Sequence, residues 1–191
     1  FGSALPAETN FAFRTRLLEV HPPRLSREAP PARADETSVD ASWRIAAADD
    51  HPTIRHAARD LADYFRRSMG VAVGTDGKPD GVRTITLAVT PETNSLTARV
   101  SVEVDRIRIG GATPREVFQA SCRLEDEMNA RGRPVVRRGV RTYTRLFSPR
   151  MTHSGYAVET FPDAYLDRLA HAGMDAILVF IEDPQDVTRK G

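Results

Sequence analysis

Cysteine is nearly absent from this chain, because Cys122 is the only one among 191 residues. No intrachain disulfide can form, so the sequence leaves open whether the protein is secreted or cytoplasmic. Long apolar runs are also lacking, which argues for a soluble protein without a membrane partner, and no signal peptide is recognisable. Since the chain begins with Phe1, we expect it to be a piece of a longer protein, and missing targeting signals then exclude little.

The chain also lacks an excess of either charge. Its 27 basic and 26 acidic residues give no general argument for binding nucleic acid or an anionic membrane. The strongest charge cluster consists of seven arginines between residues 131 and 150, but few aromatic side chains for stacking bases lie among them. We therefore expect these arginines to serve contacts between domains, and we predict no nucleic-acid partner.

Signatures of cofactors and metals are missing as well. The sequence has no glycine-rich phosphate loop, nucleophile elbow or zinc pattern. His51 and His56 lack the four-residue spacing that places two ligands on one helical face, and His171 is predicted near a helix end, where a cation suits the dipole. Cys122 is predicted to be a small core residue. We predict no cofactor and no metal site.

Proline is concentrated near the start of the chain. Residues 21–37 contain four prolines and alternating charges with almost nothing apolar to bury. This composition is typical of a linker. We therefore assign residues 1–38 to an N-terminal segment and a proline-rich linker.

Residues 40–133 have the patterns of a folded domain. Apolar residues at steps of three or four predict a helix that starts near Pro52 and ends at Gly70. A capping box of Thr113 and Glu116 predicts a second helix, which ends at Gly132.

Between these helices, polar and apolar residues alternate over residues 84–89, 99–104 and 106–109. Such strands have one wet face and one buried face. The pattern predicts a two-layer α+β domain, an antiparallel sheet with two helices on one face.

Residues 137–191 have a different pattern. A strand is predicted over 139–147, a helix over 162–172, and a second strand over 176–181, where six apolar residues follow one another. A continuous apolar strand is typical of a parallel sheet that is buried on both faces. We predict the first βαβ unit of a parallel barrel, which needs further strands beside it.

Three short strings carry a resemblance to a known family. Residues 102–128 are similar to the hairpin and helix that end the accessory domain of β-N-acetylhexosaminidases of glycoside hydrolase family 20. Arg138-Gly139 resembles the pair that opens their first barrel strand, and residues 181–184 resemble the acidic end of the second. The α-glucuronidases and O-GlcNAc-removing hydrolases share this layout, so the resemblance implies an accessory domain followed by the start of a (β/α)8 barrel.

The resemblance also implies where substrate would bind, because such barrels collect their active site at the C-terminal ends of the strands. The candidate substrate-binding residues are Arg145, His153, Tyr156, Glu182 and Asp183. Hexosaminidases place an Asp and an Arg in the first strand where this chain has Tyr143 and Leu146, and Arg145 lies one residue early.

Each candidate has an alternative interpretation. Arg145 either binds sugar hydroxyls through its fork of donors or forms an ion pair with Glu182 or Asp183. Those two carboxylates contact sugar or Arg145, or they are a solvated strand end. His153 and Tyr156 line a pocket or are ordinary surface residues.

The family's catalytic Asp-Glu pair follows the fourth barrel strand, and no residues of this chain match it, so we assign no catalytic residue. We expect the N-terminal accessory region and partial catalytic barrel of a carbohydrate-active glycoside hydrolase, inactive alone, whose partner is a carbohydrate substrate. The alternative is a non-catalytic α+β interaction or carbohydrate-binding module. The oligomeric state is left open.

Overall fold

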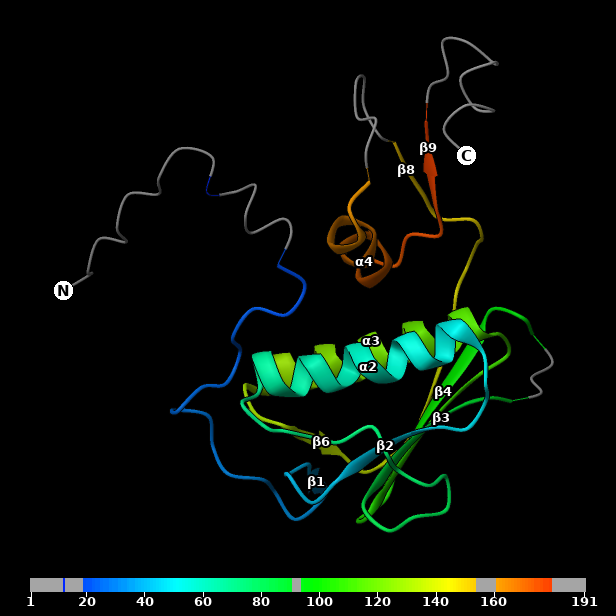
Figure 1. Ribbon diagram of the computed structural model, residues 1–191. Coiled ribbons are helices and arrows are strands. Elements are labelled where there is room, and N and C mark those ends of the chain that lie inside the picture. Colours follow the sequence, from blue (N-terminus) through cyan, green and yellow to red (C-terminus); the bar gives the residue numbers. More distant parts are fainter. Residues whose placement is uncertain (1–11, 13–18, 91–93, 154–160, 180–191) are drawn as a thin grey trace. The chain divides into compact units, whose positions relative to one another are not determined.

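The computed structural model describes residue 12 and residues 19–90, 94–153 and 161–179 (Figure 1). The chain divides into two compact units, one of residues 21–148 and one that combines residues 1–20 with 149–191. In the described part of the chain, no helix has both the length and the apolar character that crossing a membrane requires.

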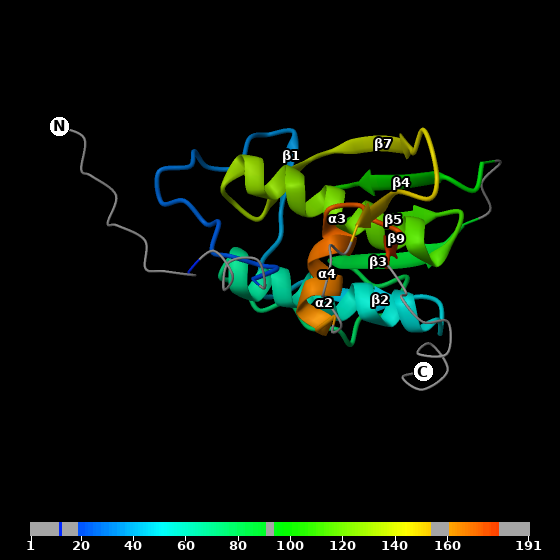
Figure 2. The ribbon, with the colours of Figure 1, turned by 90° about the horizontal axis from the view of Figure 1, so that it is seen from above.

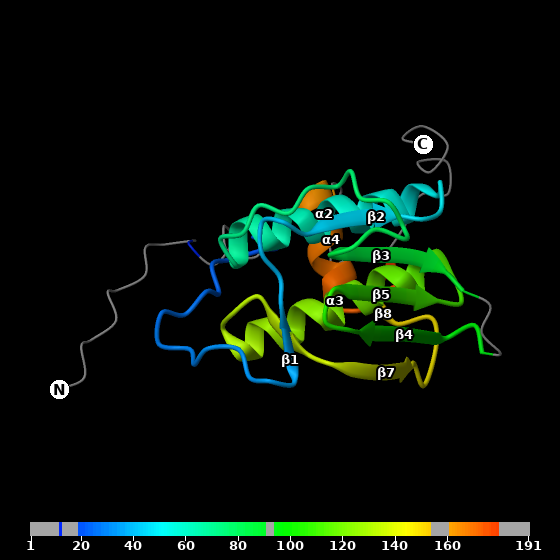
Figure 3. The same ribbon diagram turned by 90° about the horizontal axis from the view of Figure 1, so that it is seen from below.

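The larger unit has two layers. Its five-stranded sheet has the order β2-β3-β5-β4-β7, which Figure 3 shows from below. The strands are β2 (Arg44–Ala47), β3 (Thr84–Val89), β4 (Thr97–Val102), β5 (Arg106–Gly111) and β7 (Gly139–Thr144). The helices α2 (Pro52–Ser68) and α3 (Pro114–Arg131) cover one face of this sheet (Figures 1 and 2). The α+β class and the placement of both helices are therefore as predicted.

The direction of the strands differs in part from the prediction of an antiparallel sheet. β4 pairs antiparallel with β5 and β7, but β2 pairs parallel with β3, and β3 parallel with β5. The sheet is mixed because α2 is the crossover between β2 and β3, and because β5 lies between β3 and β4. Alternation of polar and apolar residues reports which face is buried and carries no information on direction.

Rows of apolar side chains line the face of the sheet that the helices cover. Ile45, Ile85 and Ile107 are paired across three neighbouring strands and are fully buried. Leu87 and Ile109 form part of the next row and are equally buried. The predicted alternation in these strands is thus confirmed, and it supplies the sheet's half of the core.

The inward faces of the two helices supply the other half. On α2, the buried residues are Ile54, Ala57, Ala58, Leu61, Tyr64, Phe65 and Ser68. On α3, Val117, Ala120, Ser121, Leu124 and Met128 are buried, as predicted. Cys122 is buried as well, in agreement with a core residue. The Tyr64 hydroxyl links the helices, because it lies 3.1 Å from both the Glu125 carbonyl oxygen and Asn129 Oδ1.

Glycines fix both ends of α3. At its start, a Cβ on Gly111 would lie 2.7 Å from the Cβ of Glu116, so only glycine lets β5 approach the helix this closely. Thr113 caps the helix by accepting a hydrogen bond from the Glu116 amide at 3.3 Å. At its end, Gly132 has a φ of 66°, the left-handed conformation typical of a helix C-terminus.

The proline-rich residues 21–35 lie against the larger unit. The amides of Arg24 and Leu25 donate to the Ser68 carbonyl at the end of α2, and the Ser26 amide donates to Gly132. The next residues form β1 (Glu36–Ser38), which pairs antiparallel with β6 (Val135–Arg137). These hydrogen bonds place the segment within the same unit as the sheet, although its composition is typical of a linker. The division into residues 1–38, 40–133 and 137–191 stays a prediction.

The prediction that residues 139–147 open the parallel unit is wrong. β7 pairs antiparallel with β4 over its whole length, from Thr97 opposite Thr144 to Val102 opposite Gly139. It is the edge strand of the five-stranded sheet. The residue types of a β-strand are the same in either setting, so the sequence pattern did not reveal which sheet the strand joins.

The smaller unit contains the parallel pair. β8 (Met151–His153) and β9 (Ala176–Leu178) pair parallel, and α4 (Asp163–His171) connects them. The predicted helix and second strand are therefore confirmed where they fall on described residues. The amide of Asp175 donates to the Arg150 carbonyl at 2.7 Å, and the Arg150 amide donates to the Asp175 carboxylate at 2.9 Å. This reciprocal contact ties together the residues that precede the two strands.

The core generates a prediction on stability. Leu61 is fully buried between α2 and the sheet, so Leu61→Ala should lower the free energy of unfolding by about 2–5 kcal/mol through lost burial and a residual cavity. Urea unfolding measures the change. Leu146, which is 92% exposed, offers the same substitution as a control, and Leu146→Ala should shift stability by less than about 0.5 kcal/mol. Equal effects of the two changes would contradict the described core.

The contact between β1 and α3 generates a second prediction. Arg131 binds the Glu36 carboxylate through Nε at 2.9 Å and Nη2 at 3.0 Å. This contact, aided by the Arg33 amide, lowers the pKa of Glu36 from 4.5 to about 2. A carboxyl group whose pKa is lower in the folded state stabilises fully above its unfolded pKa and loses that contribution as the pH falls.

We therefore expect the free energy of unfolding to decline between about pH 4.5 and pH 2, and to decline less in Arg131→Met. Urea unfolding at a series of pH values tests this. Arg137→Ala, which removes an exposed arginine beside Asp35, should leave the acid dependence unchanged. An identical acid dependence in Arg131→Met and the unmodified chain would refute the assignment.

Candidate functional site

The structure describes two of the five predicted substrate-binding residues. Tyr156, Glu182 and Asp183 lie outside the described residues. His153 is the last residue of β8 and is exposed. It pairs with Leu178, the last residue of β9, so both residues lie at the carboxyl ends of the parallel strands. Arg145 follows β7 and belongs to the larger unit, so the strand that carries it is not one of this parallel pair.

Arg145 binds a buried carboxylate. Its Nε lies 3.0 Å from Glu116 Oε1, and its Nη2 reaches the same oxygen. Glu116 is only 2% exposed and stands in the first turn of α3, where the helix dipole also favours an anion. Arg115 lies 3.2 Å from the same carboxylate. This ion pair joins the end of β7 to the start of α3. An ion pair was one of the two interpretations of Arg145, but its partner is Glu116 and not the expected Glu182 or Asp183.

Tyr143 lies on β7, and its side chain is directed toward α3. Its hydroxyl lies 3.0 Å from Glu127, and Arg141 donates to the same carboxylate at 2.6 Å. Burial, and then the hydrogen bond to Glu127, raise the pKa of Tyr143 to about 12. The phenol therefore stays neutral near pH 7 and holds β7 against α3.

The arginines between residues 131 and 145 serve contacts within the larger unit. Arg133 donates to the carbonyl of Ala29 at 2.8 Å, and Arg138 donates to the carbonyls of Ala34 and Glu36. These bonds hold the proline-rich segment in place. The sequence predicted contacts between domains for these side chains, whereas their described partners lie in the same unit.

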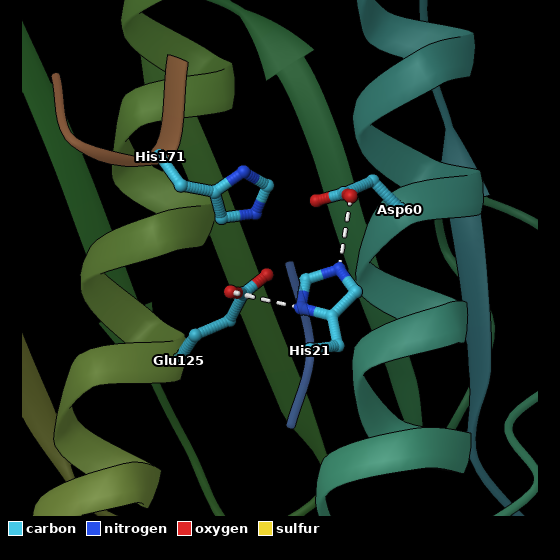
Figure 4. A group of neighbouring side chains, drawn as sticks. All are labelled: His21, Asp60, Glu125 and His171. Atoms are coloured by element: carbon cyan, nitrogen blue, oxygen red, sulfur yellow. Dashed lines mark hydrogen bonds and ion pairs between the residues drawn. The ribbon is translucent and has the colours of Figure 1, made fainter. Parts of the chain in front are cut away.

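A buried group of three ionisable side chains lies between α2 and α3. His21 comes from the proline-rich segment, Asp60 from α2 and Glu125 from α3, and Figure 4 shows the imidazole between the two carboxylates. His21 Nε2 lies 2.9 Å from Asp60 Oδ1, and Nδ1 lies 3.9 Å from Glu125 Oε2. The side chains of His21, Asp60 and Glu125 are 4%, 9% and 5% exposed. We call these residues the His21 cluster.

Tyr64 borders the His21 cluster on one side. Its ring meets the imidazole edge to face, with centroids 5.6 Å apart. Burial, and then the charge of Glu125, raise the pKa of Tyr64 above its ordinary value. The phenol is therefore neutral and adds no further negative charge beside the cluster.

The His21 cluster brings together residue types that bind metals or exchange protons. One donor atom from each of His21, Asp60 and Glu125 lies within 4.8 Å of the other two. The sequence predicted no metal site, because His51 and His56 lack the spacing of two ligands on one helix and the members of the cluster lie far apart in the chain. The sequence does contain a signal for this cluster. Asp60 and Glu125 lie beside the apolar faces of their helices, where a charged side chain needs a partner.

Comparisons with known proteins show which solved structures share this fold. No protein-family model matches this sequence, and a search of curated proteins finds no match. Among solved structures, the chain is similar to a mutant Streptomyces plicatus β-hexosaminidase in complex with its product GlcNAc. The TM-score is 0.64 at 16% identity, over 85% of this chain and 37% of that one.

Two further structures extend this likeness. A family 20 β-N-acetylhexosaminidase from Streptomyces coelicolor A3(2) matches with a TM-score of 0.61 at 21% identity, over 87% of this chain and 35% of that one. A family 115 4-O-methyl-α-glucuronidase matches with a TM-score of 0.56 at 8% identity, over 75% of this chain and 25% of that one. The chain thus has the fold of part of these glycoside hydrolases and spans about a third or less of their length.

The contact between Arg145 and Glu116 generates a prediction. Arg145→Ala leaves a buried carboxylate without its main cation, so it should lower the free energy of unfolding by about 3–5 kcal/mol. Arg123→Ala, which removes one partner of an exposed pair with Asp126, should cost less than about 1 kcal/mol. Urea unfolding at pH 7 distinguishes the two. A cost for Arg145→Ala no larger than that of the exposed pair would argue against a structural role.

Proposed function

We propose that this chain is the N-terminal part of a carbohydrate-active glycoside hydrolase similar to the β-N-acetylhexosaminidases of family 20. The larger unit would be the accessory α+β domain, and the smaller unit would begin the catalytic (β/α)8 barrel. The observation that carries the proposal is the order of the two units. An α+β layer is followed by a parallel β-α-β unit, and two matched glycoside hydrolases cover 85% and 87% of the chain.

The parallel pair supports a barrel that continues beyond it. β8 and β9 each have three residues, and Leu178 at the end of β9 is 49% exposed. Parallel strands are normally buried on both faces, so a parallel pair that contains the apolar strand β9 calls for further strands and helices around it. A (β/α)8 barrel of about 250 residues supplies such neighbours.

In this proposal β8 takes the place of the first barrel strand that the sequence suggested for residues 139–147. His153 then lies at the carboxyl end of that strand, and Glu182 and Asp183 follow the second strand in sequence. Barrel enzymes bind substrate at the carboxyl ends of their strands. We keep His153, Tyr156, Glu182 and Asp183 as proposed carbohydrate-binding residues and propose a structural role for Arg145.

Catalysis is proposed for the longer protein. No residues of this chain match the Asp-Glu pair that the family carries after its fourth barrel strand. In those hexosaminidases the substrate's own acetamido group is the nucleophile, an exception to the two-carboxylate scheme. The residues of this chain would position carbohydrate and support the barrel.

A comparison of two polypeptides tests the proposal. Residues 1–191 and the product of the whole gene are assayed for hydrolysis of a chromogenic N-acetyl-β-glucosaminide and a panel of other glycosides. We expect the whole product to hydrolyse a member of the panel and residues 1–191 to show no turnover. Turnover by residues 1–191 alone, or a gene without further βα units after β9, would sink the proposal. In the second case, binding of glycans without hydrolysis would favour a carbohydrate-binding module.

A further inference from the structure

Among the described residues, the one group of side chains that could hold a metal ion includes the His21 cluster, whose three members come from separate segments. We propose that His21, Asp60 and Glu125 bind a divalent transition-metal ion, with zinc as the best fit. The site is distinct from the proposed carbohydrate-binding residues, and it does not depend on the proposed hydrolase function.

The spacing of the donor atoms supports a bound ion. Zinc binds imidazole nitrogen and carboxylate oxygen at about 2.0–2.2 Å, so two of its ligands can lie up to about 4 Å apart. The 3.9 Å between His21 Nδ1 and Glu125 Oε2 falls in this range and is too long for a hydrogen bond. The third donor, Asp60, completes a set whose atoms all lie within 4.8 Å of one another.

The chemistry of the donors selects the class of metal. An imidazole with two carboxylates suits zinc and its neighbours in the first transition series, whereas calcium and magnesium prefer oxygen ligands alone. Sites with three protein ligands are usual for zinc when a further position is left for water or another ligand.

Charge and burial favour a dication at this place. Two carboxylates with 9% and 5% exposed side chains lie on the facing sides of α2 and α3. Burying carboxylates costs free energy unless cations or hydrogen bonds offset it. A divalent ion offsets two negative charges at once. Binding would also fasten the proline-rich segment to both helices, because His21 belongs to that segment.

Metal titration of the chain tests the site. Residues 1–191 are treated with a chelator, dialysed, and titrated with zinc by calorimetry and with cobalt(II) by visible absorption. We expect one zinc ion per chain, a rise in the melting temperature with zinc concentration, and the d–d bands of cobalt bound to nitrogen and oxygen. His21→Ala, Asp60→Asn and Glu125→Gln should each weaken binding more than about tenfold.

Two controls match these variants. Asp126→Asn changes the carboxylate next to Glu125 on the exposed side of α3, and His51→Ala removes the exposed histidine at the start of α2. Both should bind zinc as the unmodified chain does. Far-UV circular dichroism of each variant without metal shows whether it is folded, and the near-isosteric Asp60→Asn and Glu125→Gln keep the test usable if His21→Ala unfolds.

Two results would overturn the proposal. One is no zinc binding by the unmodified chain, with an unchanged melting temperature, in which case the cluster is held together by contacts between side chains. The other is zinc binding that the three substitutions leave unchanged, which would assign the metal to other residues. Neither result bears on hydrolysis by the longer protein, so the two proposals fail separately.

Discussion

The larger unit depends on one contact, the packing of α2 and α3 against the apolar face of the five-stranded sheet. Isoleucines from three strands lie in one row and are fully excluded from water, and the helices cover them with Leu61, Phe65 and Leu124. Burial of this kind is the main favourable contribution to folding and has no preferred direction. Directional contacts at the border of the core then decide how further segments attach.

Arginine side chains make most of these directional contacts, and each arginine binds a different partner. Arg131 binds Glu36 in β1, Arg141 binds Glu127, and Arg145 binds the buried Glu116. Arginine suits this task because its planar fork donates several hydrogen bonds at fixed angles. The same side chains that gave the sequence its only charge cluster therefore hold the first and last strands of the unit in place.

The two proposals concern different parts of the molecule. The hydrolase proposal depends on the parallel pair β8 and β9, whose carboxyl ends carry His153 and Leu178. The metal proposal depends on the interior between α2 and α3, where His21 meets Asp60 and Glu125. A metal ion at that place would join the segment that carries His21 to both helices.

The sequence alone determined the α+β class, the helices α2 and α3, the caps of α3, the alternation of the central strands, and the helix and second strand near the C-terminus, because periodicity and capping act over a few neighbouring residues. Only the tertiary structure decided that the sheet is mixed, that β7 belongs to it, and that β8 begins the parallel pair. It also brought His21 within reach of Asp60 and Glu125, which lie 39 and 104 positions further along the chain. Strand direction, sheet membership and such clusters arise from contacts between distant residues, and no local pattern encodes them.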